Sequence, residues 1–435
     1  MAELEALRAV RDSALRKASW RLLPLLGLAY GVAYMDRINI SFASLRMNQD
    51  LHFSASVYGF GAGLFFLSYA VLEVPSNWML VRFGARRWLA RIMLTWGLLA
   101  MAMMFVRTPM QFYAVRFLLG AAEAGFFPGV IYYLMQWFPA DQRARAISRF
   151  YIAGPIGAVV VAALAGPLMS LQGQLGLAGW QWMFLIEGLP ALVLSAVFLA
   201  ALPNRPADAA WLSGEERNWL TGVIAAESAT AAGAAPHSFA SAFRDPRVWL
   251  LGAVQCCLLT CAYGYIFSAP AIMQEATGLA LPQIGIIMAL IGLLGVPALL
   301  LAAWHSDRTS ERIWHTALGF VALGLGLVIL GLAYTQASVF LAYTLVILAN
   351  FALNGVVWAV PSDLLKDRAA ASGVAAIGAM GISGGFIGPW AMGLARDHTG
   401  DYRAGLMALS FPCLLGFILI LLLPRFLHRP GSPEA

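Results

Sequence analysis

The chain has 435 residues, of which 60% are hydrophobic and only 11% are charged. Soluble domains contain about 25% charged residues, so this composition excludes an ordinary soluble enzyme and indicates a membrane protein with many spans. The net charge of +6 does not indicate a nucleic-acid partner, because the basic residues are scattered through short segments between apolar runs. Residues 1–19 are charged and lack an apolar core, so we expect no cleavable signal peptide.

Twelve apolar segments are long enough to span a bilayer as helices, which requires about 20 residues each. They are 20–46, 57–81, 88–106, 110–137, 146–170, 181–202, 247–272, 282–304, 313–333, 337–360, 370–395 and 403–424. A polar stretch, 203–246, separates the first six from the last six, and within it Ser213 and Glu216 predict a capping box that opens an amphipathic helix. We predict an all-α membrane protein with two six-helix bundles, 1–202 and 247–435, joined by a cytoplasmic linker.

The basic residues also predict the orientation. If both termini are cytoplasmic, 22 of the 28 lysines and arginines lie in cytoplasmic segments, four lie outside and two lie within the membrane. The halves also share a weak repeat, because Arg145-Ala146 precedes Gly166-Pro167 much as Arg368-Ala369 precedes Gly388-Pro389. Parallel halves of this kind are one of the repeat arrangements of secondary transporters.

Charged residues inside two predicted spans are the strongest functional signal. Asp36 and Arg37 lie in the first span, and Arg116 and Glu123 lie in the fourth. A charge at bilayer depth costs at least roughly 2.5–3.5 kcal/mol, so such residues usually face a partner or a water-filled path. Arg116 and Glu123 share one helical face, whereas Asp36 and Arg37 point about 100° apart. We expect the helix to loosen just beyond the charges, at Pro128-Gly129.

The chemistry of these side chains separates their roles. Arginine stays protonated and presents a planar fork that matches a carboxylate, so Arg37 and Arg116 are candidates for binding a substrate anion. A carboxyl group in a low-dielectric site binds and releases a proton near neutral pH, so Asp36 and Glu123 are candidates for proton coupling. The alternative, in which the four charges only neutralise one another as ion pairs between helices, stays open.

Other polar residues in the spans give weaker signals. Glu73 is expected to cap a helix or pair with a loop arginine, and Glu187 is expected near the outer end of its helix, within reach of water. The second half has no comparable interior charge, so we expect neutral and aromatic groups to line its side of the cavity. Together with Tyr34 of the first span, the candidates are Tyr263, Asn354, Trp358 and Ser383.

Metal, redox and nucleotide chemistry are not indicated. The four cysteines fall within predicted spans, the six histidines are dispersed, and the glycine-rich runs lie inside apolar helices without a Gly-Lys-Ser/Thr sequence. We therefore expect no cofactor, no metal site and no enzymatic activity.

The basic turn Arg82-Phe83-Gly84-Ala85-Arg86-Arg87, together with twelve spans and a central polar segment, resembles the major facilitator superfamily. Asp307-Arg308 is the counterpart of this turn in the second half. Asn77 and Val81 stand where that family usually has Gly and Asp. The resemblance implies that Arg82, Gly84, Arg86, Arg87, Asp307 and Arg308 take part in the conformational change.

Three further stretches resemble the anion:cation symporter group, including bacterial tartrate, phthalate and nicotinate permease-like members. They begin at Tyr34 in Tyr-Met-Asp-Arg-Ile-Asn, at Glu73 in Glu-Val-Pro-Ser-Asn, and at Arg116 in Arg-Phe-Leu-Leu-Gly-Ala-Ala-Glu. The resemblance implies proton-coupled uptake of a small carboxylate across the bacterial inner membrane. Because one chain can form a complete transport path, we expect a functional monomer. In that group the equivalents of Asp36 and Glu123 couple protons, and those of Arg37 and Arg116 contact the anion.

Two other functions agree less well with the sequence. Gly154-Pro155 and Gly157 give a partial likeness to the motif of proton-driven exporters with the same fold. A membrane enzyme or sensor is less favoured, because the sequence shows no nucleophile–base set and no added domain.

Overall fold

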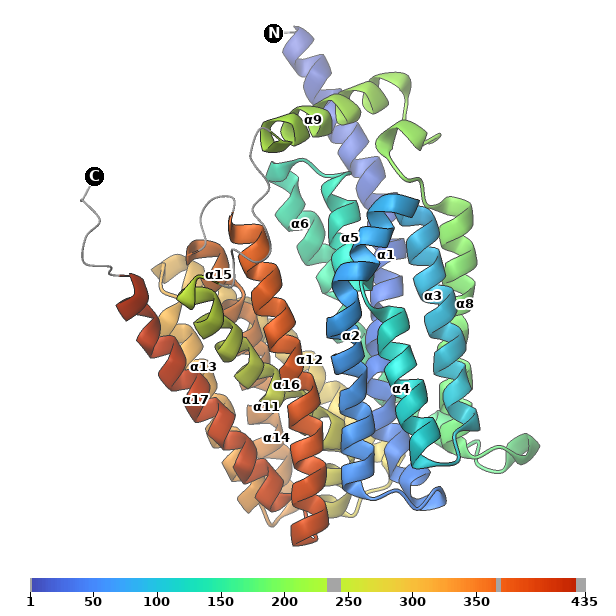
Figure 1. Cartoon of the computed structure of the whole chain (residues 1–435), viewed down its shortest axis with the longest axis vertical. Helices are drawn as coiled ribbons and strands as arrows, with labels where there is room; N and C mark the ends of the chain where they lie inside the picture. Colours follow the sequence, from blue (N-terminus) through green and yellow to red (C-terminus); the bar gives the residue numbers. More distant parts are fainter. Residues whose placement is uncertain (1, 233–243, 365–368, 428–435) are drawn as a thin grey trace.

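The structure is a computed structural model that describes residues 2–232, 244–364 and 369–427 (Figure 1). These residues form helices joined by short turns, and none of them lies in a strand. Part of the predicted linker (233–243) and Arg368 of the internal repeat lie outside the described residues.

The first half and the central segment contain nine α-helices in the described range. Their bounds are α1 (Ala2–Asp50), α2 (Ala55–Phe83), α3 (Ala85–Ala102), α4 (Pro109–Glu123), α5 (Phe126–Met135), α6 (Ala140–Tyr151), α7 (Ala153–Met169), α8 (Gly179–Ala201) and α9 (Gly214–Ala232). The second half continues with α11 (Pro246–Thr277), α12 (Leu281–Thr309), α13 (Ile313–Leu332), α14 (Gln336–Val357), α15 (Ala359–Leu364), α16 (Ala369–Thr399) and α17 (Arg403–Leu427). The twelve predicted spans match these elements, with the fourth, fifth and tenth spans each divided into two helices.

The break in the fourth span does not occur where we expected it. The helix ends at Glu123 and restarts at Phe126, because Gly125 adopts a left-handed conformation with φ of 84°. Pro128 falls in the first turn of α5, where its missing N–H leaves no hydrogen bond unmade. The prediction of a break at Pro128-Gly129 is therefore wrong by one turn, and Glu123 lies at a helix end.

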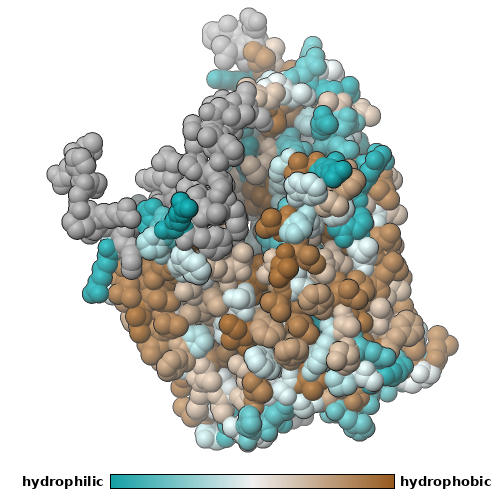
Figure 2. Space-filling model, viewed as in Figure 1, coloured by the Kyte–Doolittle hydropathy of each residue, from teal (hydrophilic) through white to brown (hydrophobic). Residues whose placement is uncertain are grey.

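On the face of the molecule seen in Figure 2, a broad apolar band lies between two more polar ends. Eleven described helical stretches are long and apolar enough to cross a membrane. The first predicted span, within α1, is not among them because it carries Asp36 and Arg37 in its apolar stretch. It nevertheless packs along α7 and α8 as part of the first half.

Two hydrophobic cores underlie the two halves, one mainly within residues 14–220 and the other within 248–423. The halves meet along α2 with α16 and along α7 with α12. At Gly59 a side chain has no room, because a Cβ atom there would lie 2.2 Å from the carbonyl oxygen of Pro389. The domain boundaries at 203 and 246 stay a proposal.

Hydrogen bonds join the halves at the end where α2 begins and α16 ends. The carboxylate of Asp397 accepts the backbone N–H groups of Ala55 at 3.0 Å and Ser56 at 2.9 Å. Close by, the Tyr58 hydroxyl donates to the carbonyl of Phe267 at 2.9 Å. A carboxylate at a helix N-terminus is favoured by the unpaired N–H groups and the helix dipole. These contacts hold the two halves together at this end.

Helix α9 is fixed to the first half, above α6 in Figure 1. The predicted capping box is confirmed: the Ser213 N–H donates to Glu216 at 2.8 Å, and the Glu216 N–H donates to the Ser213 hydroxyl at 3.2 Å. Glu216 also accepts bonds from Ser13 at 2.7 Å and Lys17 at 2.8 Å of α1. Burial alone would raise the pKa of Glu216, but these bonds outweigh it and lower the pKa to about 2.

Candidate functional site

Helix packing brings the four predicted charges into one region of the first half. Helix α2 packs on α4, and α3 packs on both α4 and α8, while α1 lies against α8. Asp36 is 2% exposed, and Arg116 and Glu123 are each 1% exposed. Asp36, Arg116 and Glu123 lie close enough to act on one another electrostatically. The charges are thus placed in a low-dielectric interior, where electrostatic interactions are strongest.

Arg37 and Glu123 form a direct ion pair between α1 and the end of α4. The guanidinium of Arg37 also lies over the aromatic rings of Phe65, at 5.4 Å, and Tyr69, at 5.6 Å. One carboxylate oxygen of Glu123 and the Nε of Arg37 have no hydrogen-bond partner in the described part of the chain. The pair therefore has hydrogen-bonding capacity left for a ligand.

Arg116 is buried without a direct acidic partner. Its guanidinium donates to the carbonyl oxygen of Ala62 at 3.3 Å and lies 5.0 Å from the centroid of the Phe65 ring. Within the described residues it forms no ion pair, and its Nε has no partner. The Phe65 ring thus contacts two guanidinium groups, and one of them has no carboxylate against it. An arrangement of this kind favours the binding of an anionic ligand.

Asp36 points away from this pair, as the helical geometry predicts. Its carboxylate accepts a hydrogen bond of 2.7 Å from the indole N–H of Trp96 on α3, and a long one of 3.4 Å from the Asn39 amide. The adjacent residues Asp36 and Arg37 of α1 therefore interact with different helices. Arg37 faces α2 and α4, whereas Asp36 faces α3.

The expectation for Glu187 is wrong. Its side chain is not within reach of water, because the residue is only 3% exposed. Both carboxylate oxygens lack a normal hydrogen-bond partner among the described residues. Glu73 is half-buried and lies within electrostatic range of Arg37. Glu187 lies on the face of α8 that packs against its neighbours α1 and α3. The sequence of α8 does not show which of its faces meets those helices, so the expected exposure to water was wrong.

The predicted polar residues of the second half occupy different positions. Tyr263 of α11 reaches the first half: its ring centroid lies 4.3 Å from that of Phe66, and it is within electrostatic range of Tyr34 and Arg37. The Asn354 amide donates to the carbonyl of Asn350 at 2.8 Å within α14. Trp358 lies at the break between α14 and α15, and Ser383 is exposed on α16, 3.4 Å from the sulfur of Cys256.

The turn residues contact their own halves. Gly84 ends α2 with φ of 85°, and Arg86 binds Asn204 and the carbonyl of Leu199. The guanidinium of Arg82 lies over Trp78 and Phe83, and Arg87 is exposed. In the second half, Asp307 pairs with Arg312 at 2.6 Å and Arg308 lies over Trp304. Their part in the conformational change stays a prediction.

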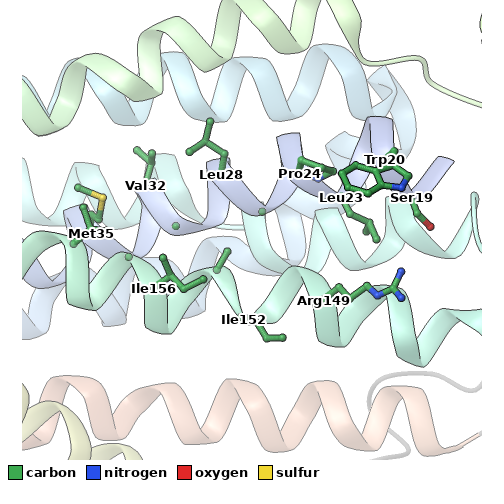
Figure 3. A pocket seen from close by; sticks show the side chains of 15 residues that line it. Ser19, Trp20, Leu23, Pro24, Leu28, Val32, Met35, Arg149, Ile152 and Ile156 are labelled. Atoms are coloured by element: carbon green, nitrogen blue, oxygen red, sulfur yellow. The ribbon is translucent and has the colours of Figure 1, made fainter. Parts of the chain in front are cut away.

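A groove of about 720 Å³ between α1 and α7 is not the candidate site (Figure 3). Its lining is mainly apolar, with Leu28, Val32 and Ile156 along it and Arg149 toward one end. Met35, but neither Asp36 nor Arg37, contributes to this lining. The groove therefore lies away from the charges.

Sequence reasoning did not single out three aromatic residues at the site: Phe65, Tyr69 and Trp96. In an apolar span such residues look like packing or lipid-facing groups. The available signal was indirect. Each charge in a membrane needs a partner on a neighbouring helix, and an indole N–H or an aromatic face supplies one.

Comparison with known proteins agrees with this architecture. The model of the Major Facilitator Superfamily matches residues 26–389. A "Putative tartrate transporter" of Agrobacterium vitis is 44% identical over 97% of this chain and 97% of its own length. The "Putative metabolite transport protein NicT" of Pseudomonas putida is 39% identical over 94% of each chain. A "Quinolone resistance transporter" of Acinetobacter baumannii is 36% identical over 95% of this chain and 96% of its own.

Among solved structures, a bacterial homologue of the human lysosomal transporter Spinster, in an inward-facing and unoccupied conformation, has the same fold. The TM-score is 0.79 with 16% identity, over 97% of this chain and 99% of that one. The sequence resemblance is thereby confirmed, and the protein is a multi-pass membrane transporter rather than an enzyme. The chain belongs to the major facilitator superfamily.

Proposed function

We propose that this transporter imports a small organic anion together with protons, by alternating access. The observation that carries the proposal is the ion pair between the partly buried Arg37 and the buried Glu123, beside the buried Arg116, which has no acidic partner in the described residues. Two guanidinium groups in the protein interior suit a carboxylate substrate better than a lipophilic cation. The substrates that fit are hydroxy-dicarboxylates, sugar acids and aromatic carboxylates, and the name of the tartrate-transporter relative supports this class.

The ion pair supplies a coupling mechanism. While Glu123 is ionised, it occupies the guanidinium of Arg37. A proton on Glu123 removes that charge, so Arg37 becomes available to a carboxylate of the substrate. Proton and anion therefore favour each other's binding, which is the thermodynamic requirement for symport. Asp36, bonded to Trp96, is the second proton-coupling candidate.

The second half supplies neutral contacts in this scheme. Tyr263 reaches toward Arg37 from α11 and is placed to donate its hydroxyl hydrogen to a bound anion. Tyr34, Asn354, Trp358 and Ser383 are the further proposed lining residues. We propose that the protein lies in a bacterial inner membrane with both termini in the cytoplasm, and the distribution of basic residues supports this orientation. One chain with twelve spans can form a complete transport path, so we propose a functional monomer.

A proton-driven exporter of the same fold is the second candidate, because one relative is named as a quinolone resistance transporter. The two candidates differ in the charge of the ligand and in the direction of transport. The two interior arginines, Arg37 and Arg116, favour the importer.

The test is uptake of a carboxylate panel, with a lipophilic cation for comparison, into proteoliposomes with and without an inward proton gradient. We expect one carboxylate to accumulate only with the gradient. Glu123→Gln should equilibrate this substrate without concentrating it, and Glu275→Gln, which alters an ion pair with Arg396 away from the four charges, should behave as wild type. If no anion responds to the gradient, or if Glu123→Gln concentrates it as well as wild type, the proposal is wrong.

A further inference from the structure

Glu187 is a buried carboxyl group that the scheme above does not use. It lies on α8, is 3% exposed, and has no normal hydrogen-bond partner for either oxygen among the described residues. An ionised carboxylate in such surroundings is strongly disfavoured unless a cation or hydrogen-bond donors compensate it. The charges and donors around Glu187 therefore determine whether its carboxyl group is protonated or ionised.

The elements packed on α8 offer no cation at this level. From α1, Asp36 acts on Glu187 electrostatically and Asn39 lies beside its carboxyl group. Helix α7 has no titratable side chain, and the three arginines of α3 lie in its first seven residues. That part of α3 packs farther along α8, where Ser195 donates to the carbonyl of Ala90. The nearest charge is thus a second acid.

Asn39 lies between Asp36 and Glu187, and one of its own side-chain atoms lacks a hydrogen-bond partner among the described residues. Its amide nitrogen donates to Asp36, but its Oδ1 is buried without a donor. Asp36 has the indole N–H of Trp96 as a second donor, whereas among the described residues the one side chain beside Glu187 that could donate to it is the shared Asn39 amide. Two neighbouring buried acids do not both ionise readily, and the one with fewer donors keeps the proton.

We propose that Glu187 is protonated in this state and, through Asn39, positions Asp36 for proton coupling. The Glu187 hydroxyl supplies the donor that Asn39 Oδ1 lacks, and this fixes the amide so that its nitrogen faces Asp36. Glu187 is a positioning residue, because it acts on the coupling carboxyl group through Asn39. This inference rests on the proposed function for its transport consequence only.

The protonation state is tested without any substrate. The infrared spectrum of wild-type protein in liposomes at pH 7 is compared with that of Glu187→Gln, the near-isosteric variant that cannot ionise. We expect a protonated-carboxyl C=O band that the variant lacks. If wild type instead shows a carboxylate band that disappears in the variant, Glu187 is ionised and the proposal is overturned.

The positioning role is tested by the pH dependence of proton-driven uptake. Glu187→Leu and Asn39→Leu should each move the pH of half-maximal uptake by roughly half a unit or more, the effect of one hydrogen bond. The double variant should shift it no further than either single one. Glu187→Gln, which keeps a donor, should restore the wild-type midpoint, and Ser195→Ala, which removes another buried bond from α8, should leave it unchanged.

Unchanged midpoints in both leucine variants would overturn the positioning role. A lower proton-to-substrate ratio in Glu187→Gln would overturn it in another way, since Glu187 would then release its proton in the cycle. If wild type moves no carboxylate with protons, the proposed function fails instead. The infrared comparison still decides the state of Glu187 in that case.

Discussion

The two halves of this transporter differ in how they treat polar groups inside the membrane. The first half buries Asp36, Arg116, Glu123 and Glu187, whereas the buried polar side chains described in the second half are all neutral, among them Gln255 and Asn350. Both halves have six spans and their own hydrophobic core. The same fold therefore buries charge in one half and only neutral polar groups in the described part of the other. In the proposed mechanism, the first half recognises the anion and binds protons, and the second half supplies a neutral wall.

Loss of Arg37 from the charged half should have the largest effect on uptake. Arg37→Gln leaves Glu123 buried without its partner and removes a fork for the anion. A hydrogen bond to a charged group contributes about 1.5–3 kcal/mol, so loss of the Arg37 contact with the anion should lower uptake at low substrate concentration by roughly 10- to 100-fold. Initial rates in proteoliposomes, with gel filtration to confirm folding, measure this.

Arg403→Gln is the matched control, because its guanidinium lies over the Tyr334 ring in the second half, away from the charges. Uptake by this variant should stay within about twofold of wild type, as is usual for exposed charges. If Arg37→Gln transports as well as Arg403→Gln, Arg37 does not bind the anion.

Loss of a hydroxyl from the second half should have a smaller effect. Tyr263→Phe keeps the ring contact with Phe66 and removes only the hydroxyl, which lies within electrostatic range of Arg37. One hydrogen bond corresponds to roughly 1 kcal/mol, so KM should rise about three- to tenfold with little change in kcat. Tyr265→Phe on the same helix removes a buried hydroxyl that has no hydrogen-bond partner among the described residues, and should leave KM unchanged. Equal KM values for both variants would remove Tyr263 from the site.

The sequence was sufficient to predict the membrane spans, and to predict that interior charges lie in the first half and neutral polar groups in the second. Apolar length determines which segments cross a membrane, and charge inside such a segment is visible directly. The sequence was not sufficient to predict which helices contact one another. Periodicity shows which residues of one helix share a face, as for Arg116 and Glu123, but not which neighbour that face meets. The Trp96–Asp36 bond and the burial of Glu187 both depend on how α3 and α8 are rotated about α1, and Gly125 breaks α4 through a left-handed conformation that the nearby Pro128 obscured.

The smallest effect on transport should come from α9, which is attached to the charged half through Lys17, Ser13 and Glu216. The pKa of Glu216 is lowered to about 2, so its bonds stabilise the fold at pH values above its ordinary pKa of 4.5 and are lost as the pH falls through about 2. Glu216→Gln should therefore lower stability at pH 7, by about 1 kcal/mol because Lys17 is partly exposed. Uptake should not change.

Thermal unfolding of purified protein at decreasing pH measures this difference, and the gap between wild type and Glu216→Gln should narrow below pH 4.5. Glu215→Gln, on the exposed side of the same turn, is the control and should match wild type throughout. A gap that widened on acidification would show that Glu216 is not held ionised by α1. Slower uptake by Glu216→Gln would mean that α9 takes part in the movement of the halves, and the contrast between a charged half and a neutral half would then have to include the linker.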